Sequence, residues 1–324
     1  MKKFSHVNAL TIDEAVSILR RYGDRASLIA GGTDLLGKMK DRILSRYPEA
    51  LVNLKTIPGL DFIKEENRIL EIGALTRLED IAIDQTVRGG YAALAQAANR
   101  TASPHLREMG TIGGNICQDI RCWYYRHPNN RFPCLRKGGG RCYAIEGDNR
   151  YHSIFGGSVE EGCYAVHPSD TAPALIALDA EIRTSKRTIK AGDLFQVEVT
   201  KTTVLDEDEI VTKILVPRPP ENAKSGFVKF ALRKTIDFPI VNCAALISSS
   251  EGKVSAARIC LNAVYVNPYR ATRAEEVIVG KTINEADAEA AGSAAVSEAK
   301  PLPHNSYMVQ IAKTMVKRAI LACG

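Results

Sequence analysis

The sequence predicts a fold that combines α-helices with β-strands (α+β) and is divided into two units. Short apolar runs typical of strands alternate with segments whose apolar residues recur every three to four positions. The chain has 324 residues, of which 45% are hydrophobic, enough to bury a substantial core in about two domains. Pro217-Arg218-Pro219-Pro220 interrupts the regular pattern. We therefore expect one domain over residues 1–218 and a smaller one over residues 222–324.

The first unit begins with a strand, a glycine turn and a helix. Residues 26–30 are an apolar strand, Gly31-Gly32 is a turn, and Thr33 or Asp34 is a candidate cap for a helix that starts at Leu35. The following patterns predict, in order, a strand over 50–54, a strand over 68–73, and helices over 78–84 and 91–100.

Regular patterns return after a long irregular stretch. They predict structure over the apolar run 172–180, strands over 182–189 and 210–216, and, in the second unit, strands over 227–232, 241–248 and 256–266. An Ala-rich helix is expected near residues 284–300. A final helix from Ser306 places one apolar face at helical spacing, made of Met308, Ile311, Met315, Ala319 and Ala322.

Charge and hydropathy exclude two classes of function. The net charge is +6, but the basic residues are interleaved with 37 acidic ones, so we expect no nucleic-acid binding and favour a surface for an acidic protein partner. Met1-Lys2-Lys3-Phe4 leads into polar residues, and no run of about 18 apolar residues occurs. The sequence therefore predicts a cytoplasmic protein that does not enter a membrane.

Five of the eight cysteines fall within residues 117–163, in a segment without helical or strand periodicity. Because disulfides are disfavoured in a reducing cytoplasm, such clustering indicates metal binding. The segment is rich in Arg, Asn, Gly and Pro, which predicts an insert built of loops with little hydrophobic core of its own. The spacings contain no C-x-x-C pair of the kind that structural zinc sites use.

Two glycine pairs are candidates for phosphate binding. They occur in Ala30-Gly31-Gly32-Thr33-Asp34 and in Thr111-Ile112-Gly113-Gly114-Asn115. Glycine lets a diphosphate approach the backbone closely, although a glycine pair before a helix is equally typical of a plain turn. Neither pair has the G-x-G-x-x-G order, so a Rossmann dinucleotide site is not predicted.

Four segments carry a resemblance to a known family. Residues 29–42 (IAGGTDLLGKMKDR), 102–115 (ASPHLREMGTIGGN), 169–174 (SDTAPA) and 262–281 (NAVYVNPYRATRAEEVIVGK) resemble the flavin-binding subunit of the xanthine dehydrogenase and carbon monoxide dehydrogenase family. Outside the cysteine-rich segment, the similarity covers nearly the whole chain.

The resemblance implies a vanillyl-alcohol-oxidase (PCMH)-type FAD-binding fold with two α+β subdomains, followed by a small C-terminal α+β domain. It also implies that Asp170 binds the adenosine ribose of FAD and that Lys229 lies near the flavin. A helix cap and a solvated strand charge, respectively, are the alternative roles. The other residues that it places around FAD are Ala30, Gly31, Gly32, Thr33, Asp34, Leu35, Ala102, Thr111, Gly114 and Asn115.

The cysteine-rich segment, about residues 119–165, resembles that of the beta subunit of 4-hydroxybenzoyl-CoA reductase. Four thiolates on a long loop can hold a [4Fe–4S] cluster, and the predicted ligands are Cys122, Cys134, Cys142 and Cys163. Cys117 belongs to the second glycine turn, so we expect it to pack against the core and not to be a ligand. Zinc binding and thiols that bind no metal are the alternatives.

This resemblance implies an electron relay rather than a catalytic site. A ferredoxin-type donor would supply the cluster, and a [2Fe–2S] small subunit and a molybdenum-cofactor large subunit would complete a dimer of heterotrimers, with the substrate on a partner chain. His105, His127 and His167 have no identifiable nucleophile beside them, so no catalytic residue is predicted. Two alternatives remain: a flavoprotein subunit of a purine, CO or aromatic-ring hydroxylase, and a zinc-stabilised docking module that has lost FAD, which would be colourless.

Overall fold

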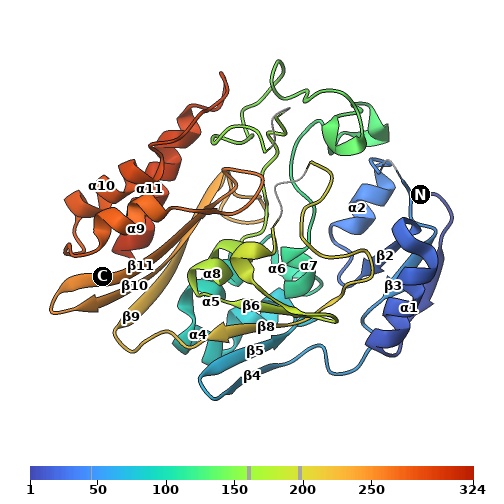
Figure 1. Cartoon of the computed structure of the whole chain (residues 1–324), viewed down its shortest axis with the longest axis horizontal. Helices are drawn as coiled ribbons and strands as arrows, with labels where there is room; N and C mark the ends of the chain where they lie inside the picture. Colours follow the sequence, from blue (N-terminus) through green and yellow to red (C-terminus); the bar gives the residue numbers. More distant parts are fainter. Residues whose placement is uncertain (45, 159–161, 196–198) are drawn as a thin grey trace.

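A computed structural model describes residues 1–44, 46–158, 162–195 and 199–324. Its first layer is a three-stranded parallel sheet with the order β1-β3-β2, formed by β1 (Ser5–Asn8), β2 (Ala26–Ile29) and β3 (Ala50–Asn53) (Figure 1). Helix α1 (Ile12–Tyr22) begins where the Thr11 hydroxyl accepts the Glu14 N–H, and its apolar face packs in the core beside this sheet. Helix α2 (Leu35–Lys40) follows β2.

The second layer is a five-stranded antiparallel sheet whose central pair joins distant parts of the chain. Its order is β4-β5-β8-β6-β7, with β5 paired to β8. Its core includes residues of the helices that lie on it. The strands are β4 (Ile63–Glu66), β5 (Ile69–Gly73), β6 (Glu181–Thr184), β7 (Thr188–Lys190) and β8 (Val211–Pro217), and the helices are α3 (Leu78–Ile83), α4 (Gln85–Gly90), α5 (Ala92–Asn99), α6 (Pro104–Arg107), α7 (Ile112–Ile116) and α8 (Thr171–Ala177).

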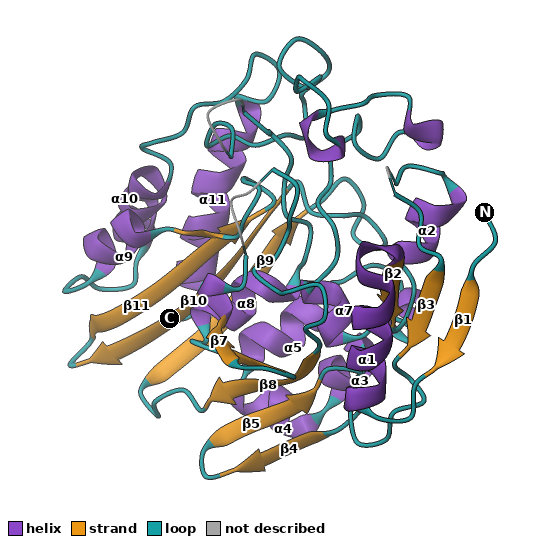
Figure 2. Ribbon diagram, turned by 45° about the vertical axis from the view of Figure 1, so that its right-hand side comes forward, coloured by secondary structure: helices purple, strands orange, loops and turns teal. Residues whose placement is uncertain are grey.

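The third layer is a four-stranded antiparallel sheet covered by helices on both faces. Its order is β12-β11-β10-β9, and one face packs against the C-terminal helices while the other meets α5 and α8 through small residues such as Ala93 and Ala174 (Figure 2). Its elements are β9 (Ala223–Phe230), β10 (Val241–Ser250), β11 (Lys253–Asn262), β12 (Tyr269–Arg270), α9 (Thr272–Ile278), α10 (Glu285–Ala295) and α11 (Tyr307–Leu321).

The cysteine-rich segment, green in Figure 1, forms a loop-rich region at one end of the molecule. Between α7 and α8, the described residues form two 3-10 turns, η2 (Pro128–Asn130) and η3 (Leu135–Lys137), and otherwise only isolated β-bridges such as that of Arg121 with Val166, as the irregular sequence predicted. The segment nevertheless has a small core, because the Phe132 ring contacts Tyr124 and Tyr143 with centroids 5.1 Å apart in both pairs. The buried cluster in this region is small and includes Ile43 and Val266 from outside the segment, which agrees with the expectation of little core of its own.

The mixed fold is confirmed, as are most of the expected helices and strands. The region 182–189, expected to be extended, is divided into β6 and β7, because a turn at Ser185 to Arg187 reverses the chain. The Ala-rich helix ends at Ala295 and does not reach residue 300. Sequence patterns did not predict β1, α1 or α9. The boundary between the two expected domains stays a prediction, since the third sheet packs directly on α5 and α8.

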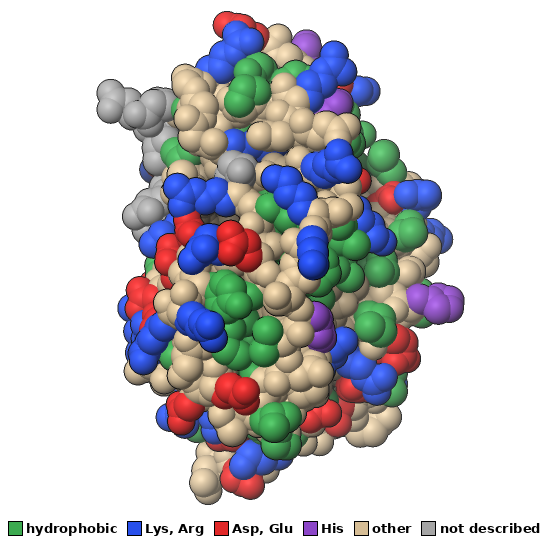
Figure 3. Space-filling view, turned by 90° about the vertical axis from the view of Figure 1, so that its right-hand side faces the viewer, with side chains coloured by type: hydrophobic (Ala, Val, Ile, Leu, Met, Phe, Trp, Pro, Cys, Tyr) green, Lys and Arg blue, Asp and Glu red, His purple; other side chains and the backbone are tan. Residues whose placement is uncertain are grey.

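Surface charge is mixed in sign. Lys and Arg side chains alternate with Asp and Glu over the face shown in Figure 3, with no single basic stripe on that face. In the part of the chain that the structure describes, no helix combines the length and the hydrophobicity needed to cross a membrane.

Candidate functional site

A cavity of about 490 Å³ lies between the two glycine turns. At the first turn, a Cβ on Gly31 would lie 2.1 Å from the Met109 carbonyl oxygen, so only glycine allows the two turns to approach. Gly32 has φ +71°, a left-handed conformation that glycine adopts without strain. The cavity is lined by all six residues predicted from this turn: Ala30, Gly31, Gly32, Thr33, Asp34 and Leu35.

The second glycine turn forms the opposite wall. The Thr111 hydroxyl accepts the Gly114 N–H at 3.2 Å and caps α7, while a Cβ on Gly113 would lie 2.8 Å from the Ala74 carbonyl oxygen. A Cβ on Gly114 would meet only the Thr111 hydroxyl, at 3.1 Å. Gly114 is exposed and lines the cavity, so a side chain there would occupy space that a ligand could use.

Asn115 connects this turn to the Ser-Asp-Thr segment. Its Oδ1 accepts hydrogen bonds from the Ser169 hydroxyl at 2.5 Å and the Thr171 hydroxyl at 2.7 Å. Ala102, which also lines the cavity, has φ +49°, an unusual conformation for a residue with a Cβ. Cys117 is exposed and lines the same cavity, in contrast to the core packing that we expected.

Asp170 and Lys229 form a buried ion pair. The Lys229 Nζ lies 2.7 Å from Asp170 Oδ2, and their side chains are 4% and 3% exposed. Burial raises the pKa of Asp170, although Lys229 and a hydrogen bond from Asn242 Nδ2 at 2.7 Å oppose that rise. Asp170 lines the cavity, whereas Lys229 lies behind it and also donates to the Arg100 carbonyl at 2.9 Å. Their contacts with FAD stay predictions.

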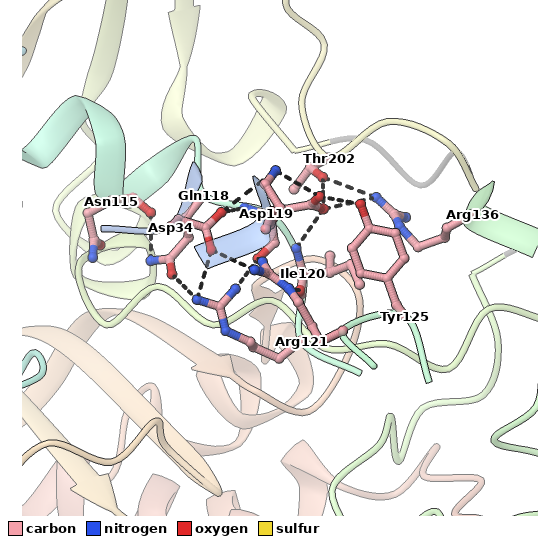
Figure 4. A network of polar contacts seen from close by, with 11 residues as sticks. Asp34, Asn115, Gln118, Asp119, Ile120, Arg121, Tyr125, Arg136 and Thr202 are labelled. Atoms are coloured by element: carbon pink, nitrogen blue, oxygen red, sulfur yellow. Dashed lines mark hydrogen bonds and ion pairs between the residues drawn. The ribbon is translucent and has the colours of Figure 1, made fainter. Parts of the chain in front are cut away.

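The Asp34 carboxylate forms hydrogen bonds and ion pairs with residues of the cysteine-rich segment. It accepts the Asp119 N–H at 3.0 Å and pairs with Arg126 at 2.8 Å and Arg121 at 3.1 Å (Figure 4). Burial by itself would raise the pKa of Asp34, but these arginines and Lys38 hold it below its usual value. The sequence did not indicate this network, and Lys38 and Arg121 are cavity-lining cations that it missed. Only contacts between residues distant in the sequence reveal them.

A second, smaller cavity is lined by four cysteines of the segment. Cys122, Cys134, Cys142 and Cys163 converge there, among Tyr124, Tyr125, Arg136 and other residues. Cys117 is not part of its lining. Burial raises the pKa of Cys122, Cys134 and Cys163, so these thiols are protonated in the metal-free chain. Among the described residues, no three His, Cys, Asp or Glu side chains are placed to hold a single metal ion.

Two buried nitrogen groups lie beside the thiols. The Lys137 Nζ is buried without a hydrogen-bond partner among the described residues, and it lies 5.3 Å from the centroid of the Tyr125 ring. The His152 Nε2 lies 3.2 Å from the Cys122 Sγ. An ammonium buried without a hydrogen-bond partner among the described residues suits an anionic group better than neutral thiols, so the residues around this cavity fit a negatively charged cluster.

The three histidines considered for catalysis are not brought together into a site. His105 and His127 belong to the short helix α6 and to the turn before η2. His167 is fully buried against Phe195, with ring centroids 4.5 Å apart. Burial, with a contribution from the Arg121 charge, lowers the pKa of His167 to about 3, so it is neutral at physiological pH. None of the three is part of an acid–base arrangement among the described residues.

Comparison with known proteins places this cavity in a family context. Residues 2–219 match the family described as the FAD binding domain in molybdopterin dehydrogenase, and residues 227–323 match the CO dehydrogenase flavoprotein C-terminal domain. The chain is 33% identical to the aldehyde oxidoreductase FAD-binding subunit PaoB of Escherichia coli, over 97% of this chain and 96% of the relative. It is 29% identical to the carbon monoxide dehydrogenase medium chain of Hydrogenophaga pseudoflava, over 99% and 96%.

The fold is similar to solved structures over its full length. A carbon monoxide dehydrogenase chain from Hydrogenophaga pseudoflava superposes with a TM-score of 0.79 at 28% identity, covering 100% of this chain and 99% of that one. A chain of quinoline 2-oxidoreductase from Pseudomonas putida 86 gives a TM-score of 0.75 at 25% identity, covering 99% and 97%. The closer resemblance to 4-hydroxybenzoyl-CoA reductase stays a prediction.

Proposed function

Because the chain belongs to the family of FAD-binding medium subunits of the molybdenum hydroxylases, which includes carbon monoxide dehydrogenase and xanthine dehydrogenase, we propose that it carries electrons from a molybdenum-containing partner chain to an external acceptor. The observation that carries this proposal is the cavity between the two glycine turns. Gly31 and Gly113 have no room for a Cβ, so the backbone walls of this cavity are held close together.

The residues of the cavity fit FAD. The glycine turns would hold the diphosphate, and Asp170 would accept a hydrogen bond from a ribose hydroxyl. When bound, FAD supplies electron chemistry that links two-electron and one-electron steps. The protein contributes the backbone walls, the nearby cations Lys38 and Arg121, and the exclusion of water from an apolar lining.

The substrate would bind on a partner chain. Assembly with a molybdenum large subunit and a [2Fe–2S] small subunit, as a dimer of heterotrimers, is part of the proposal. An aldehyde is the first substrate class to test, because the 33% identical relative is a subunit of an aldehyde oxidoreductase. Anaerobic addition of an aldehyde to the co-purified complex should bleach the flavin absorbance. A complex without FAD, or one whose flavin no molybdenum-site substrate reduces, would contradict the proposal.

We also propose that the cysteine-rich segment holds a [4Fe–4S] cluster through Cys122, Cys134, Cys142 and Cys163. The shared cavity of these four thiols and the buried Lys137 ammonium support this assignment. Such a cluster supplies one-electron transfer.

Iron and sulfide analysis of five single Cys→Ser variants tests the ligand assignment. Each of the four proposed ligands should be needed for a full complement of iron, because each would bind one iron of the cluster. Cys117→Ser is the matched control, since Cys117 lines the larger cavity and should leave the iron content unchanged. A full cluster in the Cys163 variant, together with a lost one in the Cys117 variant, would contradict the assignment.

The cysteine-rich segment also favours a second candidate function. A chain with an added one-electron site could take electrons from a ferredoxin-type donor and supply a partner that reduces 4-hydroxybenzoyl-CoA. Reduced ferredoxin, reduced viologen and NADH, added in parallel to the complex, separate this candidate from an outward relay. Fast reduction of the complex by ferredoxin and slow reduction by NADH would support electron flow toward the molybdenum partner. Fast reduction of the flavin by tightly bound NADH would contradict it.

A further inference from the structure

A buried network of polar and charged side chains is centred on Asp119 (Figure 4), and it includes residues that line each of the two cavities. The Asp119 carboxylate accepts hydrogen bonds from the Lys38 Nζ at 3.2 Å, the Tyr125 hydroxyl at 2.5 Å and the Thr202 hydroxyl at 3.1 Å. Burial by itself would raise the pKa of Asp119, but Lys38 and two arginines hold it far below its usual value. Asp119 therefore stays ionised throughout the physiological range of pH.

The two sides of this network belong to different sites. Lys38 lines the cavity between the glycine turns, and Tyr125 lines the cavity of the four thiols. Both donate to the same oxygen, Asp119 Oδ2. The carbonyl oxygen of Asp119 accepts from Arg121 at 2.6 Å and from Arg126 at 2.9 Å, and Arg126 in turn pairs with Asp34 of the first glycine turn. Along this hydrogen-bonded path, Asp119 is the one residue between Lys38 in the first cavity and Tyr125 in the second.

The charges of the network are not balanced within it. Among the described residues, the three cations Lys38, Arg121 and Arg126 pair with two carboxylates, Asp34 and Asp119, and each of these five side chains is less than a quarter exposed. Concentrating like charges away from water is unfavourable unless anions lie nearby. A diphosphate in one cavity and a cluster of thiolates in the other would supply negative charge on both sides.

We propose that Asp119 is a positioning residue that couples the two cofactor sites, so that a cluster bound by the cysteine-rich segment strengthens FAD binding. The inference rests on the proposed function, because it requires both cofactors. A bound cluster orders the loop that holds Tyr125, and through Asp119 this order extends to Lys38 and the first glycine turn. FAD then binds a glycine turn that is already ordered, so less conformational entropy is lost on binding. Because thermodynamic coupling is reciprocal, FAD should stabilise the cluster by the same factor.

The test compares FAD affinity with and without the cluster. Quenching of flavin fluorescence measures the dissociation constant of FAD for the full chain, once with the cluster assembled anaerobically and once in the Cys142→Ser variant. We expect about 10-fold tighter binding with the cluster, within the usual range for coupled sites. In Asp119→Asn the ratio should fall to about one, because the neutral amide does not attract the cations. The matched control is Asp148→Asn, which breaks an exposed ion pair with Arg150 in the same segment and should keep the native ratio.

Two further variants separate coupling from a general loss of structure. Tyr125→Phe removes only the hydroxyl that bonds to Asp119, so it should lower the ratio while the ring stays in the thiol cavity. Asp119→Glu keeps the charge and should recover part of the ratio. A ratio of affinities is informative here because a purely structural defect would weaken FAD binding to both forms alike.

The outcomes distinguish this inference from the proposed function. If the unsubstituted chain holds both cofactors but binds FAD equally tightly with and without the cluster, the coupling alone is overturned. A native ratio that persists in Asp119→Asn, or in Tyr125→Phe if the first variant does not fold, overturns the role of Asp119. A native chain without bound iron and sulfide overturns the cluster assignment and the coupling with it, while its FAD content still tests the flavin site independently.

Discussion

Replacing Lys229 with methionine would leave the Asp170 carboxylate buried without its cation. The two side chains are only 4% and 3% exposed, so solvent cannot replace the lost charge. Removing one partner of a buried ion pair costs about 3–5 kcal/mol. The hydrogen bond from Asn242 to Asp170 at 2.7 Å remains, which favours the lower end of that range. We expect the free energy of unfolding, measured by urea denaturation at pH 7, to fall by about 3 kcal/mol.

The pH dependence of this loss gives a second check. Burial already holds the pKa of Asp170 above its usual value, and removing Lys229 should raise it further. When the pKa of a carboxyl group is higher in the folded than in the unfolded protein, the free energy of unfolding falls as the pH rises, because the group ionises less readily in the folded state. The deficit should therefore be larger at pH 7 than at pH 4.5.

The matched control is Arg273→Met, which breaks an ion pair with Glu298 in which both side chains are more than half exposed. Exposed pairs contribute little, so its denaturation midpoint should hardly move. A loss below about 1 kcal/mol in Lys229→Met, or equal losses at the two pH values, would refute the assignment of this pair as a buried, strongly coupled interaction.

Three other predictions concern the cavity and its surroundings. Gly114→Val should abolish FAD binding while circular dichroism stays native, because Gly114 lines the cavity and a Cβ there would meet only the Thr111 hydroxyl, at 3.1 Å. Stoichiometric FAD after gel filtration would disprove this. His167 has a folded pKa of about 3, well below that of an unfolded histidine. Between these two values the unfolded chain binds more protons, so the free energy of unfolding should fall on acidification by up to about 1.4 kcal/mol per pH unit. In His167→Leu the denaturation midpoint should depend less steeply on pH between pH 6.5 and 4.5. An unchanged pH dependence would contradict the assignment of His167 as a buried, neutral histidine. Ala102→Gly should raise the free energy of unfolding by roughly 0.5 kcal/mol, since glycine tolerates φ +49° better than alanine, and a lowered thermal midpoint would contradict that reason.

Local patterns were enough to predict the strand and the helix beside the first glycine turn of the cavity. The strand and helix on either side of Gly31-Gly32 correspond to β2 and α2, because apolar runs and glycine turns act on the backbone through near neighbours in the sequence. The same kind of signal was present for α1, where Thr11 caps the helix, but it was not recognised. The likeness of four separated motifs to one family also predicted the FAD-binding fold, which the full-length structural similarity confirms.

What the sequence by itself determined was the class of fold, the family, and the residue types available for cofactors. Only the tertiary structure decided how these residues combine: that Lys229 faces Asp170, that Asp34 holds the cysteine-rich segment by Arg126, and that Cys117 is exposed in the cavity between the glycine turns. The physical reason is the separation along the chain of the residues that interact. Backbone conformation depends on adjacent residues, whereas a buried ion pair or a shared cavity depends on which distant surfaces pack together, and no period in the sequence records that choice.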